Sequence, residues 1–160
     1  MELVITESAF AAFAITVVIL IIYSVDDLRT RKVPNRFVFA AIFIGLFMGL
    51  QMGHLIEHAV LHLTAALLTL ILGYALFRIG ALGGADVKTL FTIAVISPGV
   101  EFTSWGNPVL EGILIVGLLF AGTMIVAYLI SQRKTDENDV IPLIPIILGV
   151  YLVMQLLAFL

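Results

Sequence analysis

Long apolar runs alternate with short polar segments along the whole chain. A helix needs about 20 apolar residues to cross a bilayer core of roughly 30 Å, and six runs approach that length. We expect six membrane helices, which run from about Ala9 to Val25, Phe37 to Met52, Ala59 to Ile79, Val87 onward, Leu110 to Ile130 and Val140 to Leu160. The fourth is the weakest, because its apolar run stops before Ser97-Pro98-Gly99. The pattern predicts an all-α membrane protein that forms a single domain over residues 1–160.

The basic residues are confined to alternate segments between these runs. With six spans, three segments on one side hold every Lys and Arg of the chain, namely Arg29, Arg31, Lys32, Arg36, Arg78, Lys88, Arg133 and Lys134. The segments on the other side carry only acidic charges, namely Glu2, Glu7, Glu57, Glu101 and Glu111. Because cytoplasmic loops attract Lys and Arg, we expect the basic side to face the cytoplasm and both termini to be extracytoplasmic.

The composition agrees with a chain surrounded by lipid. Of the 160 residues, 62% are hydrophobic and only 12% are charged, whereas a soluble domain has about a quarter of its residues charged. The chain has no Cys, which excludes a disulfide framework, a cysteine-ligated metal site and a cysteine nucleophile. We expect a multi-pass protein of the cell membrane, with membrane lipid and no nucleic acid among its partners.

Two aspartates at the ends of predicted spans are the candidates for chemistry. Asp27 follows the first apolar run, next to Asp26, and Pro34-Asn35 closes the same polar segment. Asp86 ends the sequence Gly83-Gly84-Ala85-Asp86, where small residues permit the close approach of another backbone. Each segment also fits a plainer interpretation, a solvated loop around Asp27 and a helix cap at Asp86.

The predicted topology brings Asp27 and Asp86 to the same side of the membrane. Ionisable residues near membrane depth are costly and are therefore functional candidates. Two carboxylates held within a few ångströms cannot both ionise, so such a pair shares a proton. The ionised member can take a proton from water while the protonated member hydrogen-bonds the scissile carbonyl. This is aspartic-protease chemistry, and it requires neither a metal nor a cofactor.

These motifs resemble the type IV prepilin peptidase and preflagellin (pre-archaellin) peptidase family of membrane aspartic proteases. In that family an Asp at the end of the first core span is followed seven residues later by Pro and then Asn or Asp, as Asp27 is by Pro34-Asn35. The second motif is Gly-x-Gly-Asp, usually followed by x-Lys, and here it reads Gly83-Gly84-Ala85-Asp86-Val87-Lys88. Ala85 replaces the second Gly, which is similar to archaeal members. A weaker likeness is the Pro-x-x-Pro spacing of Pro142 and Pro145.

The resemblance implies an endopeptidase that removes the leader from type IV pilin-like or archaellin precursors at the cytoplasmic membrane face. These precursors would be its partners. It implies catalytic roles for Asp27 and Asp86, with support from Pro34, Asn35, Gly83, Gly84, Ala85 and Lys88. Larger relatives also methylate the new amino terminus and carry a cytoplasmic domain with paired cysteines. This chain has neither that length nor any Cys, so we expect protease activity without methyltransferase activity.

Two further groups of polar residues are weaker candidates for a functional site. Asp136, Glu137 and Asp139 form an acidic cluster in the last basic-side segment, where they would attract the basic leader of a substrate or would simply keep a loop hydrated. His54, His58 and His62 are spaced four residues apart on the opposite side from the aspartates. We favour a polar interfacial face for them over a metal site.

Two other classes of protein stay open as alternatives. One is an intramembrane protease of the presenilin and signal-peptide-peptidase type, which places a Tyr-Asp pair in mid-span, whereas Asp27 lies at a span end. The other is a small transporter or structural membrane subunit, which would need polar residues at the bilayer midplane. The expected spans offer few such residues, namely Thr16, Thr64, Thr69 and Thr123. The sequence pattern does not distinguish a monomer from an oligomer.

Overall fold

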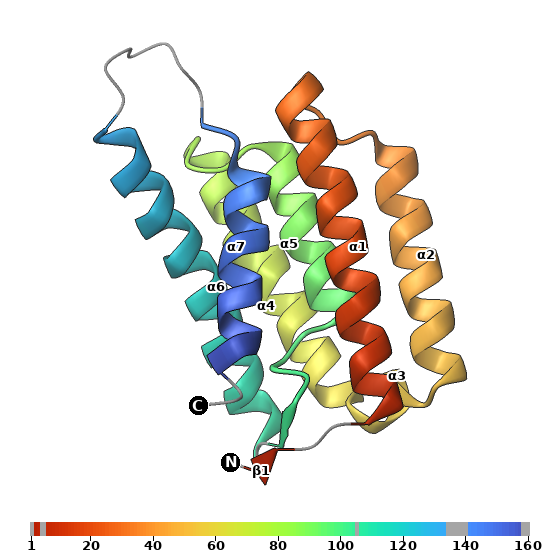
Figure 1. The fold of residues 1–160 in the computed structure, drawn as a ribbon. Coiled ribbons are helices and arrows are strands. Elements are labelled where there is room, and N and C mark those ends of the chain that lie inside the picture. The colour runs from red at the N-terminus through yellow and green to blue at the C-terminus, as the bar shows by residue number, and fades with distance from the viewer. Residues whose placement is uncertain (1, 4–5, 105, 134–140, 158–160) are drawn as a thin grey trace.

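The computed structural model describes residues 2–3, 6–104, 106–133 and 141–157. In this part the chain forms seven α-helices and two very short strands. Their bounds are β1 Glu2–Leu3, α1 Glu7–Thr30, α2 Asn35–Gln51, α3 His54–Glu57, α4 Ala59–Arg78, α5 Gly84–Ile96, β2 Thr103–Ser104, α6 Pro108–Ser131 and α7 Leu143–Leu156. All helices except the single turn α3 run roughly alongside one another, with alternating direction (Figure 1). The predicted all-α class is confirmed apart from the short strands.

Helix α1 is longer than its apolar run. It begins after Thr6, whose hydroxyl accepts the Ala9 N–H over 3.1 Å, and it ends at Arg31, which adopts a left-handed conformation with φ 56°. The helix therefore continues five residues past the predicted end at Val25. Asp26 and Asp27 lie within its last turns and not in a loop, because polar residues can continue a helix once it leaves the apolar run. The basic Arg29 in the last turn also favours this helix end.

Helix α5 is short, as the weak fourth run indicates. It begins at Gly84, three residues before the predicted start, and it ends at Ile96 after 13 residues. Its first turn is capped by the Asp86 side chain, which accepts the backbone N–H of Gly83. Its end is set by Ser97-Pro98, because the residue before a proline is disfavoured in the helical conformation.

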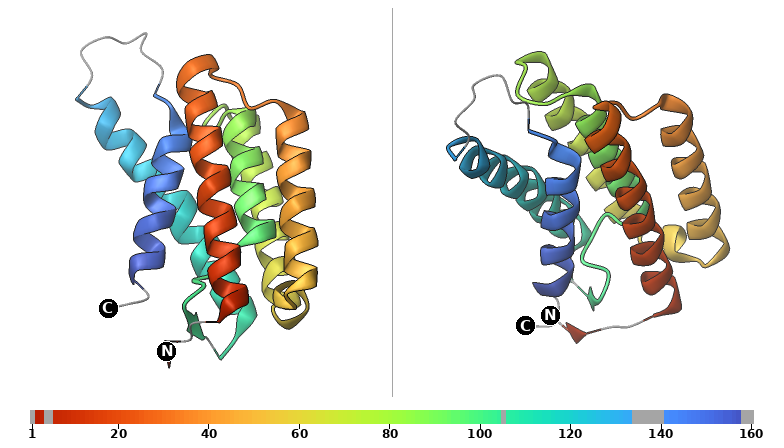
Figure 2. Two further views of the ribbon diagram at one scale, coloured as in Figure 1. Left: turned by 45° about the vertical axis from the view of Figure 1, so that its right-hand side comes forward. Right: turned by 45° about the horizontal axis from the view of Figure 1, so that its top comes forward.

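The short α5 is nevertheless the best-packed helix of the bundle. It contacts α1, α2, α4 and α7, while α6 packs against α4 and α7 (Figure 2). Its inward face supplies Leu90, Ile93 and Ala94 to the main hydrophobic core. Where α2 crosses it, a Cβ on Gly45 would come within 2.4 Å of the Ile96 side chain, so this contact requires glycine. Helix α5 as a whole is therefore held by four neighbouring helices.

Large apolar side chains cover the outside of the bundle. Phe39 and Phe43 on α2 and Ile71 on α4 are among the most exposed, at 72%, 70% and 65%. By length and composition, α1, α4 and α6 could each cross a membrane, and α2 and α7 are shorter apolar helices. Such a surface is typical of helices that face lipid. The chain is thus a multi-pass membrane protein in the coarse sense predicted.

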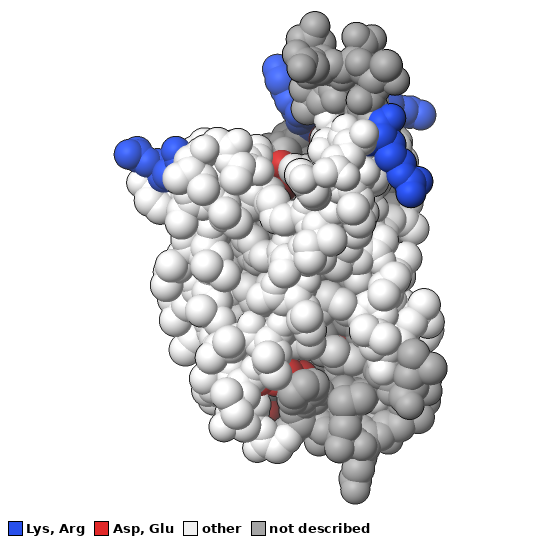
Figure 3. Space-filling model, turned by 90° about the vertical axis from the view of Figure 1, so that its left-hand side faces the viewer, with Lys and Arg blue, Asp and Glu red and all other residues white. Residues whose placement is uncertain are grey.

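The two ends of the bundle differ in charge. Every described Lys and Arg lies at the end where α1, α4 and α6 finish, and a broad uncharged flank separates this end from the other (Figure 3). At the opposite end β1 pairs antiparallel with β2, in the register Glu2↔Ser104 and Leu3↔Thr103. The sequence pattern did not predict this ladder, because two-residue strands form only where tertiary packing places them side by side.

Candidate active site

Asp27 lies on the buried face of α1, one helical turn beyond the core residue Tyr23. Leu20, Tyr23, Ser24 and Asp27 follow the three- and four-residue spacing that aligns side chains on one helix face, and all four are buried. The Asp27 side chain is only 6% exposed. Its Oδ2 accepts the backbone N–H of Ile144 over 3.4 Å, from the first turn of α7. A buried carboxylate is thus held between two helices.

Asp86 occupies the third position of α5 and is 7% exposed. Its Oδ2 accepts the Gly83 N–H over 2.9 Å. A Cβ at position 83 would approach the same oxygen to 2.9 Å, so a side chain there would displace the carboxylate. Asp86 therefore does cap the start of α5. Glycine is needed at position 83 because a side chain there would collide with the Asp86 carboxylate.

The structure brings Asp27 and Asp86 together. Helix α1 packs against α5, and the two carboxyl groups are near enough to interact electrostatically. Tyr23, Ile144 and Ala85 pack into the same hydrophobic cluster beside them. Both aspartates lie at the Lys- and Arg-bearing end of the bundle. Two buried carboxyl groups that are distant in sequence thus interact electrostatically across the contact between α1 and α5.

Asp26 differs from its neighbour Asp27 in burial. It is only half-buried, whereas Asp27 is buried. Successive helical residues point about 100° apart, so both side chains cannot face α5. The geometry therefore distinguishes two carboxylates that composition alone treats as equivalent.

The supporting residues named by the motifs have distinct positions. Gly83 and Gly84 are exposed in front of Asp86, and Ala85 packs behind it against the cluster of Tyr23 and Ile144. Lys88 is half-buried two residues after Asp86 along α5. Pro34 is the N-cap of α2 and Asn35 its first residue, so they fix where α2 starts.

Several polar residues near the aspartates were not singled out in the sequence. Tyr23 is buried and donates its hydroxyl to the Phe37 carbonyl over 3.3 Å. Thr89 and Thr92 are buried on α5 and donate to backbone carbonyls one turn back. Ser24 is buried one turn before Asp27, and its Oγ makes no hydrogen bond within the described residues. The signal that could have found them is their helical spacing from Asp27 and Asp86.

The other predicted polar groups lie elsewhere. Asp136, Glu137 and Asp139 fall outside the described residues. The predicted histidine face is interrupted, because His54 belongs to α3, His62 to α4, and His58 joins the two helices. The three rings still cluster, with the centroid of His54 4.9 Å from that of His58 and 5.3 Å from that of His62. They lie at the end of the bundle opposite the aspartates, as expected.

Comparison with known proteins identifies the family. Residues 14–130 match the type IV leader peptidase family, and this stretch includes both Asp27 and Asp86. Searches of curated proteins and of solved structures gave no match. The match confirms the resemblance drawn from the motifs and excludes a transporter or a purely structural subunit. The chain therefore belongs to the type IV leader peptidase family and is an aspartic protease.

Proposed function

We propose that Asp27 and Asp86 are the catalytic pair of an endopeptidase that cleaves leader peptides from type IV pilin-like or archaellin precursors. One observation carries this proposal. Two buried carboxyl groups from different helices lie close enough to interact, at the end of the bundle that bears the described Lys and Arg residues. Leader cleavage of prepilin-type substrates is the activity that family membership implies.

The chemistry follows from one shared proton. The ionised carboxylate takes a proton from water as the water oxygen attacks the scissile carbonyl carbon, and the protonated carboxyl donates its proton to the carbonyl oxygen. Collapse of the tetrahedral intermediate breaks the C–N bond. The first carboxyl gives its proton to the leaving amine, and the hydroxyl formed on the carbonyl oxygen returns its proton to the second carboxylate. Burial of both side chains keeps bulk water away and strengthens these electrostatic interactions.

We further propose that six helices span the cell membrane as one domain, with both termini extracytoplasmic and the aspartates at the cytoplasmic face. The alternating directions of the helices and the gathering of the described basic residues at one end support this orientation. At about 1.5 Å per residue, α5 is roughly 20 Å long, less than a bilayer core of about 30 Å. The end of α5 that stops short is Ile96, whereas Asp86 lies in its first turn, at the end of the bundle that bears the described basic residues.

Substrate cleavage by single variants tests the catalytic pair. Asn retains the shape of Asp but cannot share a proton, so Asp27→Asn and Asp86→Asn should each lower the turnover of a pilin-like precursor by roughly a thousandfold. Asp26→Asn, a neighbour that is only half-buried, should keep most of the activity. Membrane-inserted protein is quantified for each variant, and mass spectrometry of the product should find a free, unmethylated amino terminus. An essential Asp26 beside a dispensable Asp27 would overturn the assignment.

The acidic cluster is a candidate binding site for the substrate leader. Asp136, Glu137 and Asp139 lie in the segment between α6 and α7, whose flanking helix ends are at the same end of the bundle as the aspartates. We propose that they attract a basic leader, an effect that salt would screen. Replacing all three with the corresponding amides should raise KM for a basic leader several-fold at low salt and leave a neutralised leader unaffected. Equal losses for both leaders would contradict this role.

A further inference from the structure

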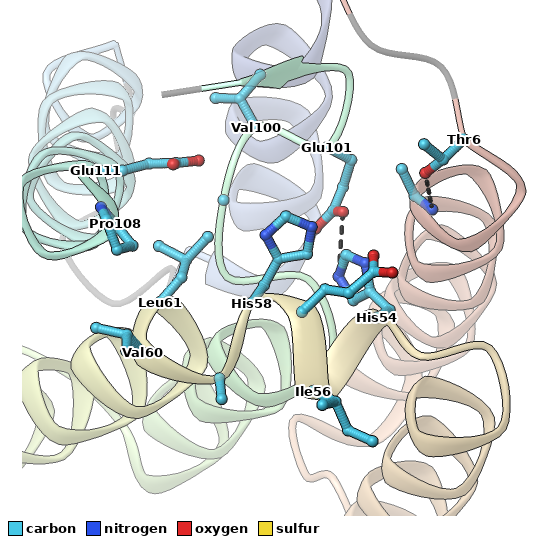
Figure 4. Close-up of a pocket in the computed structure, with 14 residues that line it drawn as sticks. Thr6, His54, Ile56, His58, Val60, Leu61, Val100, Glu101, Pro108 and Glu111 are labelled. Carbon is cyan, nitrogen blue, oxygen red and sulfur yellow. Dashed lines mark hydrogen bonds and ion pairs between the residues drawn. The ribbon is translucent and has the colours of Figure 1, made fainter. Parts of the chain in front are cut away.

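A second polar site lies at the opposite end of the bundle from the aspartates. A cavity of about 490 Å³ is bounded there by the start of α1, α3, the start of α4, residues 99–101 and the start of α6. His54, His58, Glu101 and Glu111 line it, and the apolar Val60 and Leu61 form part of its wall (Figure 4). The cavity is separated from Asp27 and Asp86 by the length of the helices, so the proposed proteolysis does not account for it.

Glu101 is held rigidly at this cavity. It is 9% exposed, its Oε1 accepts the Ser97 hydroxyl over 2.7 Å, and its backbone N–H donates to Gln155 Oε1 over 2.9 Å. Gln155 in turn donates to the Gly99 carbonyl over 3.0 Å. These contacts fix the loop to α7 and leave Glu101 Oε2 directed toward His54. The carboxyl group is thus placed in advance and does not depend on a flexible surface loop.

His54 is buried without a satisfying partner. Its side chain is 4% exposed, and neither ring nitrogen makes a hydrogen bond within the described residues. Its Nε2 lies 3.3 Å from Glu101 Oε2, but this approach lacks hydrogen-bond geometry. Buried polar groups in proteins are almost always hydrogen-bonded, so a buried imidazole that makes no hydrogen bond at the wall of a cavity points to a ligand.

Glu111 adds a second buried carboxyl group. It extends from α6 toward Glu101 and His58 (Figure 4), and a Cβ on Gly99 would come within 2.6 Å of its Oε1. None of the described Lys or Arg residues lies at this end of the bundle. Two carboxyl groups that face one cavity without a basic side chain favour a cationic ligand.

We propose that this cavity binds a ligand that carries an ammonium group on a short apolar chain. The ammonium would lie between Glu101 and Glu111, within reach of His54, and the apolar chain would lie along Val60 and Leu61. The volume lies in the range of small-molecule sites and exceeds what a bare ion needs. No group of three or more His, Cys, Asp or Glu within the described residues is arranged to hold a metal ion. Both observations favour an organic cation over a metal.

The titration of Glu101 gives this binding a pH signature. Burial raises the pKa of Glu101 to about 8, with a further upward contribution from the Glu111 charge, and burial together with His58 lowers the pKa of His54 to about 4. At pH 7 Glu101 therefore holds a proton that it must release when an ammonium binds. Affinity should rise about tenfold from pH 7 to pH 8 and level off above it. The other titratable groups that face Glu101 are Glu57 on α3, His58 at the start of α4, Glu111 on α6 and Tyr151 on α7.

Calorimetry on the full chain in nanodiscs tests the proposal. The ligands are n-hexylammonium, the uncharged n-hexanol and Zn²⁺, and a second arm adds an amine-headgroup lipid to learn whether a lipid competes for the same site. Hexylammonium should bind at one site, at least about tenfold more tightly than hexanol, because the charged group makes the decisive contacts. Equal affinities for the alcohol and the amine, or one-site binding of Zn²⁺ alone, would overturn the proposal.

Substitution of Glu101 and Glu111 tests whether these side chains bind the ammonium group. Glu101→Gln combined with Glu111→Gln should weaken hexylammonium at least about tenfold and remove the pH dependence. Glu7→Gln, at an exposed position in the first turn of α1, should leave the affinity unchanged. Unchanged affinity in the double variant would contradict the assignment, and should that variant fail to insert, the amine–alcohol comparison on the native chain still decides. Asp27→Asn should bind the amine like the native chain, which separates this site from the proposed catalytic pair.

Discussion

At the scale of single residues, the environment of Asp27 depends on a contact distant in sequence. Its Oδ2 accepts the N–H of Ile144 at the start of α7. Pro142 and Pro145 on either side have no N–H to donate, so Ile144 is one of few donors in this helix turn. An N–H from a helix start stabilises a nearby negative charge. The Pro-x-x-Pro spacing therefore has a physical consequence at the proposed catalytic pair.

Removal of that N–H should slow catalysis. Ile144→Pro deletes the donor at a first-turn position, where a helix tolerates proline. We expect roughly a tenfold lower kcat, because a hydrogen bond to a charged group contributes about 1.5 kcal/mol or more. Ile144→Ala keeps the N–H and truncates the same buried side chain, so it is the matched control. Equal kcat values for the two variants, at equal amounts of inserted protein, would show that the N–H has no catalytic effect.

The sequence predicted the two aspartates but not this contact. Asp27 was distinguished from Asp26 by the motif register, and burial of Asp27 agrees with that choice. Ile144 is 117 positions away from Asp27, and no local pattern reports a backbone donor at such a distance. Ser24 and Thr89 were missed for a simpler reason, since a lone small polar residue stands out only when its helical spacing from Asp27 or Asp86 is considered.

At the scale of elements, the short α5 is positioned by contacts that leave no room for larger residues. Gly45 on α2 lies against Ile96 at the end of α5, and a Cβ there would approach the Ile96 side chain to 2.4 Å. Gly49, one turn later on the same helix, would bring a Cβ no closer than 3.5 Å to Leu55. Substitutions at Gly45 therefore test close packing between helices, whereas substitutions at Gly49 test helix propensity alone.

The same substitution at these two positions should have opposite effects. Gly45→Ala should lower stability by about 1–3 kcal/mol, because it overpacks the contact between α2 and α5. Gly49→Ala should be neutral or stabilise by up to about 1 kcal/mol, because Ala favours a helix over Gly. Thermal unfolding in detergent measures both changes, and the double variant Gly45→Ala with Ile96→Val should recover part of the loss. A Gly45→Ala protein as stable as Gly49→Ala would contradict the close packing.

The hydrophobic pattern predicted the long elements better than their ends. All six expected helices are present, yet α1 continues beyond its apolar run and carries Asp27 inside a helix. Hydropathy reports which residues favour lipid, whereas a helix ends where its backbone hydrogen bonds end. The single turn α3 and the paired β1 and β2 were not predicted, because elements this short depend on tertiary contacts.

At the scale of the whole molecule, the bundle has two chemically different ends. One end carries the described Lys and Arg residues with Asp27 and Asp86, and the other carries His54, Glu101 and Glu111 around a cavity. The charge pattern predicted the first end, because its basic residues follow the alternation of the loops. The second end was seen only as a row of histidines, since Glu101 and Glu111 come from separate segments that the fold brings together.

The most direct test of the central claim is cross-linking from one side of the membrane. The chain has no Cys, so Asp27→Cys with Asp86→Cys introduces a single pair of thiols. A short, membrane-impermeant thiol cross-linker is applied to inverted and to right-side-out vesicles, and the linked peptides are identified by mass spectrometry. Positions 27 and 86 should become linked in inverted vesicles only, and more efficiently than the control pair at positions 26 and 86. No link between positions 27 and 86, or a link formed only from the outer side, would contradict a catalytic pair at the cytoplasmic face.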